Sequence, residues 1–144
     1  MAIKQMHNVG IVVDDLEPTI DFFRELGLEL EGQGTFDGDW GGRVTGLHGQ
    51  VVEIAMMRTP DGNGRLELSR FRTPPTVADH RNDPVNALGY LRVMFEVDDL
   101  DDTLARVRKH GAELVEEVVR YEDIYRLCYI PGPGRLLIGL AETL

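Results

Sequence analysis

The chain has 144 residues, 42% of them hydrophobic and 28% charged, which is typical of one soluble globular domain with its own core. The formal net charge of −10 argues against binding to nucleic acid or to an anionic membrane surface, because both need clustered lysine and arginine. Cys128 is the only cysteine, and no apolar run has the length of a signal-peptide core or a membrane span. We therefore expect a cytoplasmic protein without disulfides.

A short sequence pattern occurs twice along the chain. Residues 8–16 read Asn-Val-Gly-Ile-Val-Val-Asp-Asp-Leu, and residues 92–100 read Arg-Val-Met-Phe-Glu-Val-Asp-Asp-Leu. The same spacing also brings Gly27 onto Gly111 and Leu30 onto Leu114. A constant offset over this length indicates an internal duplication. In each copy, a short apolar strand runs into the start of a helix.

The first copy opens a module with one helix and four strands. The helix begins at Asp14 or Asp15, where Glu17 completes a capping box, and it ends at Gly27. Its core-facing stripe is predicted to contain Leu16, Ile20, Phe23 and Leu26. Strands are predicted at residues 6–13, 28–36, 50–58 and 65–71, with a glycine-rich loop at residues 38–42 and a hairpin loop at residues 59–64.

The second copy opens a module with the same order of elements. Its helix starts at about Asp99 and stops at Gly111. Strands are predicted at residues 91–97, 113–120, 125–130 and 135–141, with a turn at residues 131–134. The chain is therefore predicted to be one α+β domain, residues 1–144, of two tandem βαβββ modules. Module one covers about 1–72 and module two about 91–144, and the connection covers about 73–90.

These features resemble the vicinal oxygen chelate superfamily, which includes glyoxalase I, extradiol dioxygenases and bleomycin-binding proteins. The resemblance lies in the paired modules, the Val-Asp-Asp-Leu signatures and the Leu-Glu-Leu strand at residues 66–68. It implies a cup-shaped mixed β-sheet with helices on its outer face, and it implies a homodimer. It does not fix a reaction, because one scaffold hosts several chemistries.

In metal-dependent members, the resemblance implies four ligand positions, which fall here on Asn8, Glu67, Arg92 and Gly139. Only Glu67 is a usual ligand, since Asn8 is a weak neutral donor, Arg92 is a permanent cation and Gly139 has no side chain. We therefore predict no bound metal. Two alternatives are a divalent metal at Glu67 with non-standard partners, and a local bulge that would turn His7 into the site.

Strand alternation places Asn8, Glu67 and Arg92 opposite the apolar sets of their strands, so that they line the cup. Arg92 and Glu67 are predicted to form an ion pair where the metal would lie. One interpretation is that this pair replaces the metal as a structural tie. The other is that Arg92 binds a carboxylate, phosphate or enolate oxygen of a ligand while Glu67 acts as a general base.

Several other side chains are candidates for ligand contacts. Trp40 is either a lid over the cup or a loop anchor, and only one of Met56 and its neighbour Met57 can face the cup. Tyr125 and Tyr129 share one face of their strand, but the pattern does not say which face. The predicted ligand-binding residues are Asn8, Arg92, Glu67, Trp40, Met56 and Tyr125.

Two functions remain open from the sequence. The first is a glyoxalase/bleomycin-resistance-like protein that binds a small amphipathic or anionic molecule in the sheet cup without metal. The alternative is a lyase, isomerase or dioxygenase of the same superfamily that acts on a vicinal-oxygen substrate, either with a metal or with Glu67 as the base. Whether the chain is an enzyme stays open at this point.

Overall fold

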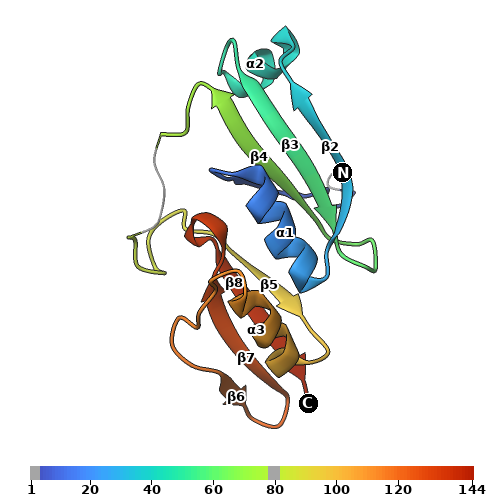
Figure 1. The fold of residues 1–144 in the computed structure, drawn as a ribbon, viewed down its shortest axis with the longest axis vertical. Coiled ribbons are helices and arrows are strands. Elements are labelled where there is room, and N and C mark those ends of the chain that lie inside the picture. The colour runs from blue at the N-terminus through green and yellow to red at the C-terminus, as the bar shows by residue number, and fades with distance from the viewer. Residues whose placement is uncertain (1–3, 78–81) are drawn as a thin grey trace. The chain divides into compact units, whose positions relative to one another are not determined.

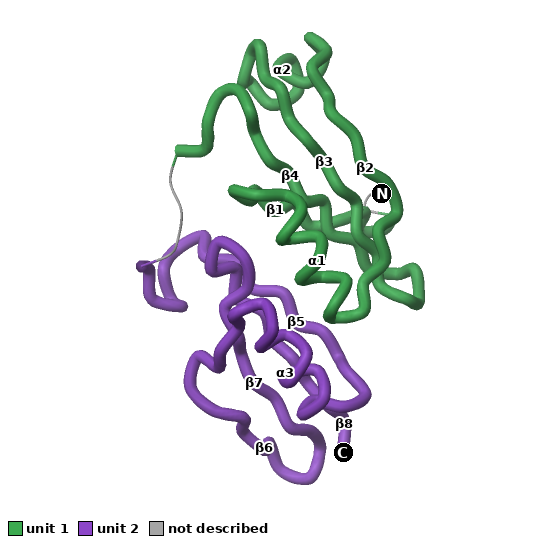
Figure 2. The backbone as a smooth tube through the Cα atoms, in the orientation of Figure 1, with its two compact units in different colours: residues 1–77 green, residues 78–144 purple. Residues whose placement is uncertain are grey.

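The computed structural model describes residues 4–77 and 82–144, which form two compact units, Met1–Val77 and Ala78–Leu144 (Figure 2). Their boundary lies within the predicted connection, of which residues 78–81 are outside the described residues. Each unit contains one four-stranded mixed sheet. No helix in the described ranges is long and apolar enough to cross a membrane.

Unit 1 contains four strands and two helices (Figure 1). In sheet 1 the strand order is β1-β4-β3-β2, with β1 parallel to β4 and the other neighbours antiparallel. The elements are β1 (Val9–Val12), α1 (Leu16–Leu26), β2 (Glu29–Phe36), α2 (Asp39–Thr45), β3 (Val51–Arg58) and β4 (Arg65–Thr73).

Unit 2 repeats this arrangement with one long helix. In sheet 2 the strand order is β5-β8-β7-β6, and β5 is parallel to β8. The elements are β5 (Arg92–Glu96), α3 (Leu100–Arg108), β6 (Val119–Tyr121), β7 (Tyr125–Pro131), a 3-10 turn η1 (Pro133–Arg135) and β8 (Leu137–Thr143). The two sheets thus have the same order and the same parallel edge pair, and the predicted α+β fold of two βαβββ modules is confirmed.

The core of each unit lies between its long helix and one face of its sheet. In unit 1 the predicted stripe of α1 is buried at Leu16, Ile20 and Phe23, and Gly27 ends the helix with a φ of +109°. Below that helix, β3 and β4 bury the alternate residues Ala55, Met57, Leu66 and Leu68. In unit 2, α3 buries Leu100, Leu104 and Val107, and the sheet buries Cys128, Ile130, Ile138 and Leu140.

The glycine-rich segment after β2 is a helix and not the predicted loop. Gly38 is the N-cap of α2, and Gly46 ends it with a φ of +84°. A Cβ at Gly42 would lie 2.8 Å from the Cα of His48 and 2.9 Å from the carbonyl oxygen of Leu47, so glycine lets the helix pack against the turn that follows. The low helix propensity of glycine misled the prediction, because close packing decides this segment.

Three further predictions about element ends are wrong in detail. The N-cap of α1 is Asp15, which makes no side-chain cap hydrogen bond, and the carboxylate of Glu17 accepts a bond from the side-chain amide of Gln33. The strand predicted at residues 113–120 is reduced to β6. The last strand begins at Leu137, because residues 133–135 continue the turn as a 3-10 segment.

Candidate functional site

Each sheet has one face that its long helix does not cover. We call this the open face; in sheet 1 it carries Gly10, Gly32, Ile54, Met56, Arg65, Glu67 and Ser69. Residues that pair across strands point to the same side, and Glu67 pairs with Met56 on β3 and with Gly10 on β1. Met57 is fully buried on the other side. Met56 is therefore the methionine of the open face.

The carboxylate of Glu67 is half-buried and makes no hydrogen bond or ion pair with any residue in the described ranges. The row across the sheet is Gly10, Glu67, Met56 and Gly32. A Cβ built at Gly10 or at Gly32 would meet no atom within 4 Å. Open space therefore lies on both sides of the Glu67 and Met56 pair.

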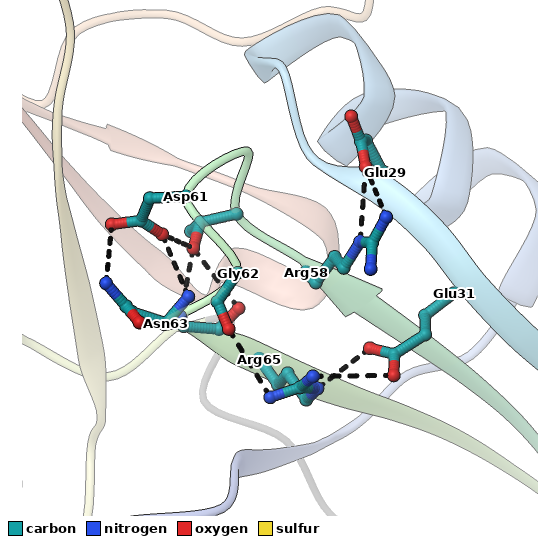
Figure 3. A network of polar contacts seen from close by, with 9 residues as sticks. Glu29, Glu31, Arg58, Asp61, Gly62, Asn63 and Arg65 are labelled. Atoms are coloured by element: carbon teal, nitrogen blue, oxygen red, sulfur yellow. Dashed lines mark hydrogen bonds and ion pairs between the residues drawn. The ribbon is translucent and has the colours of Figure 1, made fainter.

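The neighbouring charges of sheet 1 are neutralised by partners (Figure 3). Arg65 lies 2.8 Å from Glu31, and Arg58 lies 3.0 Å from Glu29. The hydrogen bond from Arg65 holds the pKa of the Glu31 carboxyl below its usual value. Glu31 reaches Arg65 because the register of β2 shifts between Leu30 and Gly32. Strand alternation puts Arg65 on the face of Glu67, but it could not reveal Glu31 as the partner of Arg65, since a bulge interrupts strict alternation.

The hairpin loop between β3 and β4 is ordered by Asp61. Its carboxylate accepts hydrogen bonds from the hydroxyl of Thr59 at 2.6 Å and from the backbone N–H of Asn63 at 2.9 Å, as Figure 3 shows. The bond from Thr59 is the main cause of the lowered pKa of Asp61. This turn fixes the adjoining strand ends, which carry Arg58 and Arg65.

The remaining candidates of unit 1 lie at the two ends of the sheet. Asn8 is half-buried and directly precedes β1, and its alternation with Val9 and Gly10 puts it on the side of Gly10. His7 is exposed outside the strand, and β1 pairs with β4 without a register shift, so the bulge that would redirect His7 is absent from β1. Trp40 lies in α2, is 59% exposed, and packs edge-to-face on Phe36 with ring centroids 6.3 Å apart.

The open face of sheet 2 carries Arg92, Met94, Tyr121, Tyr125, Leu127, Tyr129, Gly139 and Ala141. Tyr125 and Tyr129 both lie on this face, which settles the alternative left by the sequence. The guanidinium of Arg92 lies over the ring of Tyr129, 6.0 Å from its centroid. Tyr125 stacks on Tyr121 with centroids 5.6 Å apart. These ring contacts were not predicted, because alternation gives the face of a side chain but not its rotamer.

Gly139 lies at the centre of this face between Met94 on β5 and Tyr129 on β7. A Cβ at Gly139 would lie 2.7 Å from the Cε of Met94 and 3.0 Å from the Cε1 of Tyr129. The space that a longer side chain would need is thus filled by two neighbouring side chains. Sequence reasoning noted the glycine but not its covering.

The donors at the four implied ligand positions do not fit a divalent ion. Arg92 offers only N–H donors and a positive charge, and Gly139 offers no side chain while Met94 and Tyr129 occupy the space above it. Across the described ranges, no group of three or more His, Cys, Asp and Glu residues is placed to hold a metal. The predicted ion pair between Glu67 and Arg92 would join the two units, and it stays a prediction.

Cys128 takes no part in either open face. It is 3% exposed on the side of sheet 2 that packs against the helix, and burial raises the pKa of its thiol. A buried thiol with a raised pKa is a poor nucleophile.

Comparisons with known proteins agree with the fold. The family model of the glyoxalase/bleomycin resistance protein/dioxygenase superfamily matches residues 7–129. A crystal structure of a glyoxalase family protein from Bacillus cereus is 63% identical, with a TM-score of 0.96, and the match covers 100% of this chain and 97% of that one. No curated protein matches the chain at a significant level.

More distant structures share the fold alone. A glyoxalase family protein from Enterococcus faecalis is 20% identical, with a TM-score of 0.66, and the match covers 99% of this chain and 100% of that one. A variant of the fosfomycin resistance protein FosX from Listeria monocytogenes, crystallised with Mn(II) and a dihydroxypropylphosphonic acid, is 15% identical. Its TM-score is 0.63, and the match covers 96% of this chain and 90% of that one.

Proposed function

The chain belongs to the glyoxalase/bleomycin resistance protein/dioxygenase superfamily, and from this premise we propose that it binds a small amphipathic or anionic molecule without a metal. The proposed binding surface is the open face of sheet 2, which carries Arg92 and Gly139, two of the positions where the resemblance implies metal ligands. The observation that carries the proposal is the side-chain set at those positions: Asn8, Arg92 and Gly139 supply no anionic ligand, and only Glu67 does. A guanidinium would repel a divalent cation at short range.

The open faces have the chemistry that an amphipathic ligand needs. Met56 and Met94 offer flexible, polarisable contacts that adapt to irregular apolar shapes. Arg92 is exposed, and its planar N–H fork suits a carboxylate or phosphate. Ligand pockets commonly combine such apolar walls with a few polar groups that fix orientation.

The proposal is tested by the compound that the protein carries. The chain is purified natively without chelator and then denatured, and the released small molecules are identified by mass spectrometry. We expect one amphipathic or anionic compound in an amount close to that of the protein. Arg92→Gln is expected to lower its amount, whereas Arg120→Gln, on the opposite side of sheet 2, is the matched control. A wild-type protein that carries no compound and binds none from a metabolite extract contradicts the proposal.

A second candidate function is favoured by the carboxylate of Glu67, which has no partner among the residues that the structure describes. As a general base it would serve a lyase or isomerase that acts on a vicinal-oxygen substrate. Turnover of methylglyoxal–thiol adducts or of catechols, lost in Glu67→Gln and kept in the control Glu31→Gln, would establish the enzyme. Without turnover of either substrate class by the wild-type chain, the binding function is preferred.

The assembly expected from the resemblance is a homodimer. We propose that two copies of the chain associate in the cytoplasm of the cell. Light scattering coupled to size-exclusion chromatography tests this, and a mass equal to one chain across the concentration range would contradict it.

A further inference from the structure

Arg92 differs from the other arginines of the strands in the group that its guanidinium contacts. Six of them form ion pairs: Arg58 with Glu29, Arg65 with Glu31, Arg70 and Arg72 with Glu53, Arg120 with Asp123, and Arg126 with Asp101 and Glu142. Arg92 has no carboxylate partner in the described part of the chain, although the sequence has 25 acidic residues against 15 basic ones. Its guanidinium instead lies over the ring of Tyr129.

The carboxylate that shares a strand and a face with Arg92 is already engaged. Glu96 accepts a hydrogen bond of 2.5 Å from the hydroxyl of Thr143. At the rise of a β-strand, four residues place the backbones of Arg92 and Glu96 about 13 Å apart. The guanidinium of Arg92 is therefore an exposed cation held over an aromatic ring, and no carboxylate of residues 4–77 or 82–144 accepts from its N–H donors.

Next to this cation the open face of sheet 2 is aromatic and apolar. Tyr129 and Tyr125 stand four residues apart on β7, and Tyr121 stacks on Tyr125 with an interplanar angle of 27°. Tyr121 is 51% exposed and Met94 46% exposed. A planar apolar group thus finds tyrosine faces and a flexible thioether beside a guanidinium.

We propose that this face binds an aromatic carboxylate, with the carboxylate on Arg92 and the ring against Tyr129 and Met94. The proposal rests on the proposed function and narrows its ligand to one chemical class. A guanidinium forms two parallel hydrogen bonds to a carboxylate, which fixes the orientation of the anion. Aromatic rings prefer offset stacked or edge-to-face contacts with tyrosine, and Met94 adapts to the edge of the ring.

Three probes of matched size separate the contact of the carboxylate with Arg92 from the contact of the aromatic ring with Tyr129 and Met94. The chain is titrated with 2-naphthoate, with the neutral analogue 2-naphthylmethanol and with the saturated analogue decahydronaphthalene-2-carboxylate, and binding is followed by NMR chemical shifts and calorimetry. We expect 2-naphthoate to bind at least about tenfold more tightly than either control, because only it engages both the cation and the rings. Equal affinity for all three probes overturns the proposal.

Four variants localise the site. Arg92→Gln is expected to weaken 2-naphthoate binding at least about tenfold and to leave 2-naphthylmethanol binding unchanged. Tyr129→Leu weakens both, and Tyr129→Phe retains both. Arg120→Gln is the matched control, since its guanidinium belongs to the same sheet and points to the other side. Arg92→Lys, which keeps the charge and loses the fork, replaces Arg92→Gln if that variant does not unfold cooperatively.

Other results assign the face to a different occupant. If a Tyr121→Asp variant turns a dimer into monomers and the wild type does not bind 2-naphthoate, the face holds a second copy of the chain and the proposal is wrong. If the natural compound released from the protein lacks a ring or a carboxylate, the proposed function stands and the aromatic carboxylate is excluded. A chain that carries no compound and binds no probe overturns both.

Discussion

Gly139 shows how one residue changes the chemistry of a face without changing the sheet. It occupies a position where the resemblance implies a glutamate, yet its strand pairs regularly with β5 and β7. Met94 and Tyr129 lean over the glycine, so close that a Cβ would lie 2.7 Å from the methionine methyl group. The covering by Met94 and Tyr129 therefore depends on having glycine at this position.

A double-mutant cycle tests this coupling. On its own, Gly139→Ala raises the strand propensity, which stabilises the fold, but it also forces Met94 to move, which destabilises the fold. In a Met94→Ala background the clash with the thioether is removed. We expect the same substitution to be better tolerated there by at least about 0.5 kcal/mol in the free energy of unfolding, measured by urea denaturation. Additive effects would show that Met94 does not cover Gly139 in solution.

Sequence alternation predicted which face of the sheet each side chain lies on, but it did not predict which side chains contact one another. It placed Glu67 on the side of its strand opposite the helix correctly, because Leu66 and Leu68 mark the buried side without ambiguity. It left Met56 and Met57 undecided, since two adjacent methionines carry the same pattern. Only the register, in which Met56 pairs with Glu67, resolves them.

At the scale of elements, the two Asp-Asp-Leu starts are alike in sequence and different in capping. In α3 the side chain of Asp99 accepts a hydrogen bond of 2.9 Å from the backbone N–H of Asp102. In α1 the equivalent Asp15 makes no such bond. Both helices instead share a hydroxyl bond: Thr19 and Thr103 each donate to the carbonyl oxygen of their N-cap residue at 2.7 Å.

This difference in capping predicts that the substitution of Asp by Ala lowers the free energy of unfolding by different amounts at Asp15 and at Asp99. Asp99→Ala removes a side-chain cap and should lower the free energy of unfolding by about 1 kcal/mol. Asp15→Ala removes an equally exposed carboxylate that makes no capping bond, and it should cost less. Chemical denaturation of both variants measures the difference. Equal costs would mean that the side-chain cap of α3 does not contribute in solution.

The elements that the sequence predicted well are those with a strong periodic signal. The apolar stripe of α1 and the apolar alternation of β4 each indicate one buried face. The predicted ends of both elements agree with the observed ends within one or two residues. The segments predicted poorly depend on contacts distant in sequence. Gly42 is helical because it packs on the turn after α2, and β6 is short because its pairing with β7 covers only Val119–Tyr121.

At the scale of the whole molecule, the duplication sets the order of the strands in both sheets and leaves the chemistry of their open faces free. The two sheets repeat the same order, so the family's ligand positions are found by topology even where the residues have changed. The family, the fold and the faces of Glu67 and Arg92 followed from the repeat. The contact of Arg92 with the Tyr129 ring and the ion pair of Arg65 could not be predicted from the repeat. Side-chain rotamers and β-bulges do not change the periodic pattern of the sequence.

Elemental analysis of the chain purified without chelator tests whether these positions hold a metal. We expect iron, zinc and manganese contents far below one ion per chain, unchanged in Glu67→Gln, because Glu67 alone is a weak site. One ion of any of these metals per wild-type chain, lost in Glu67→Gln, would contradict it.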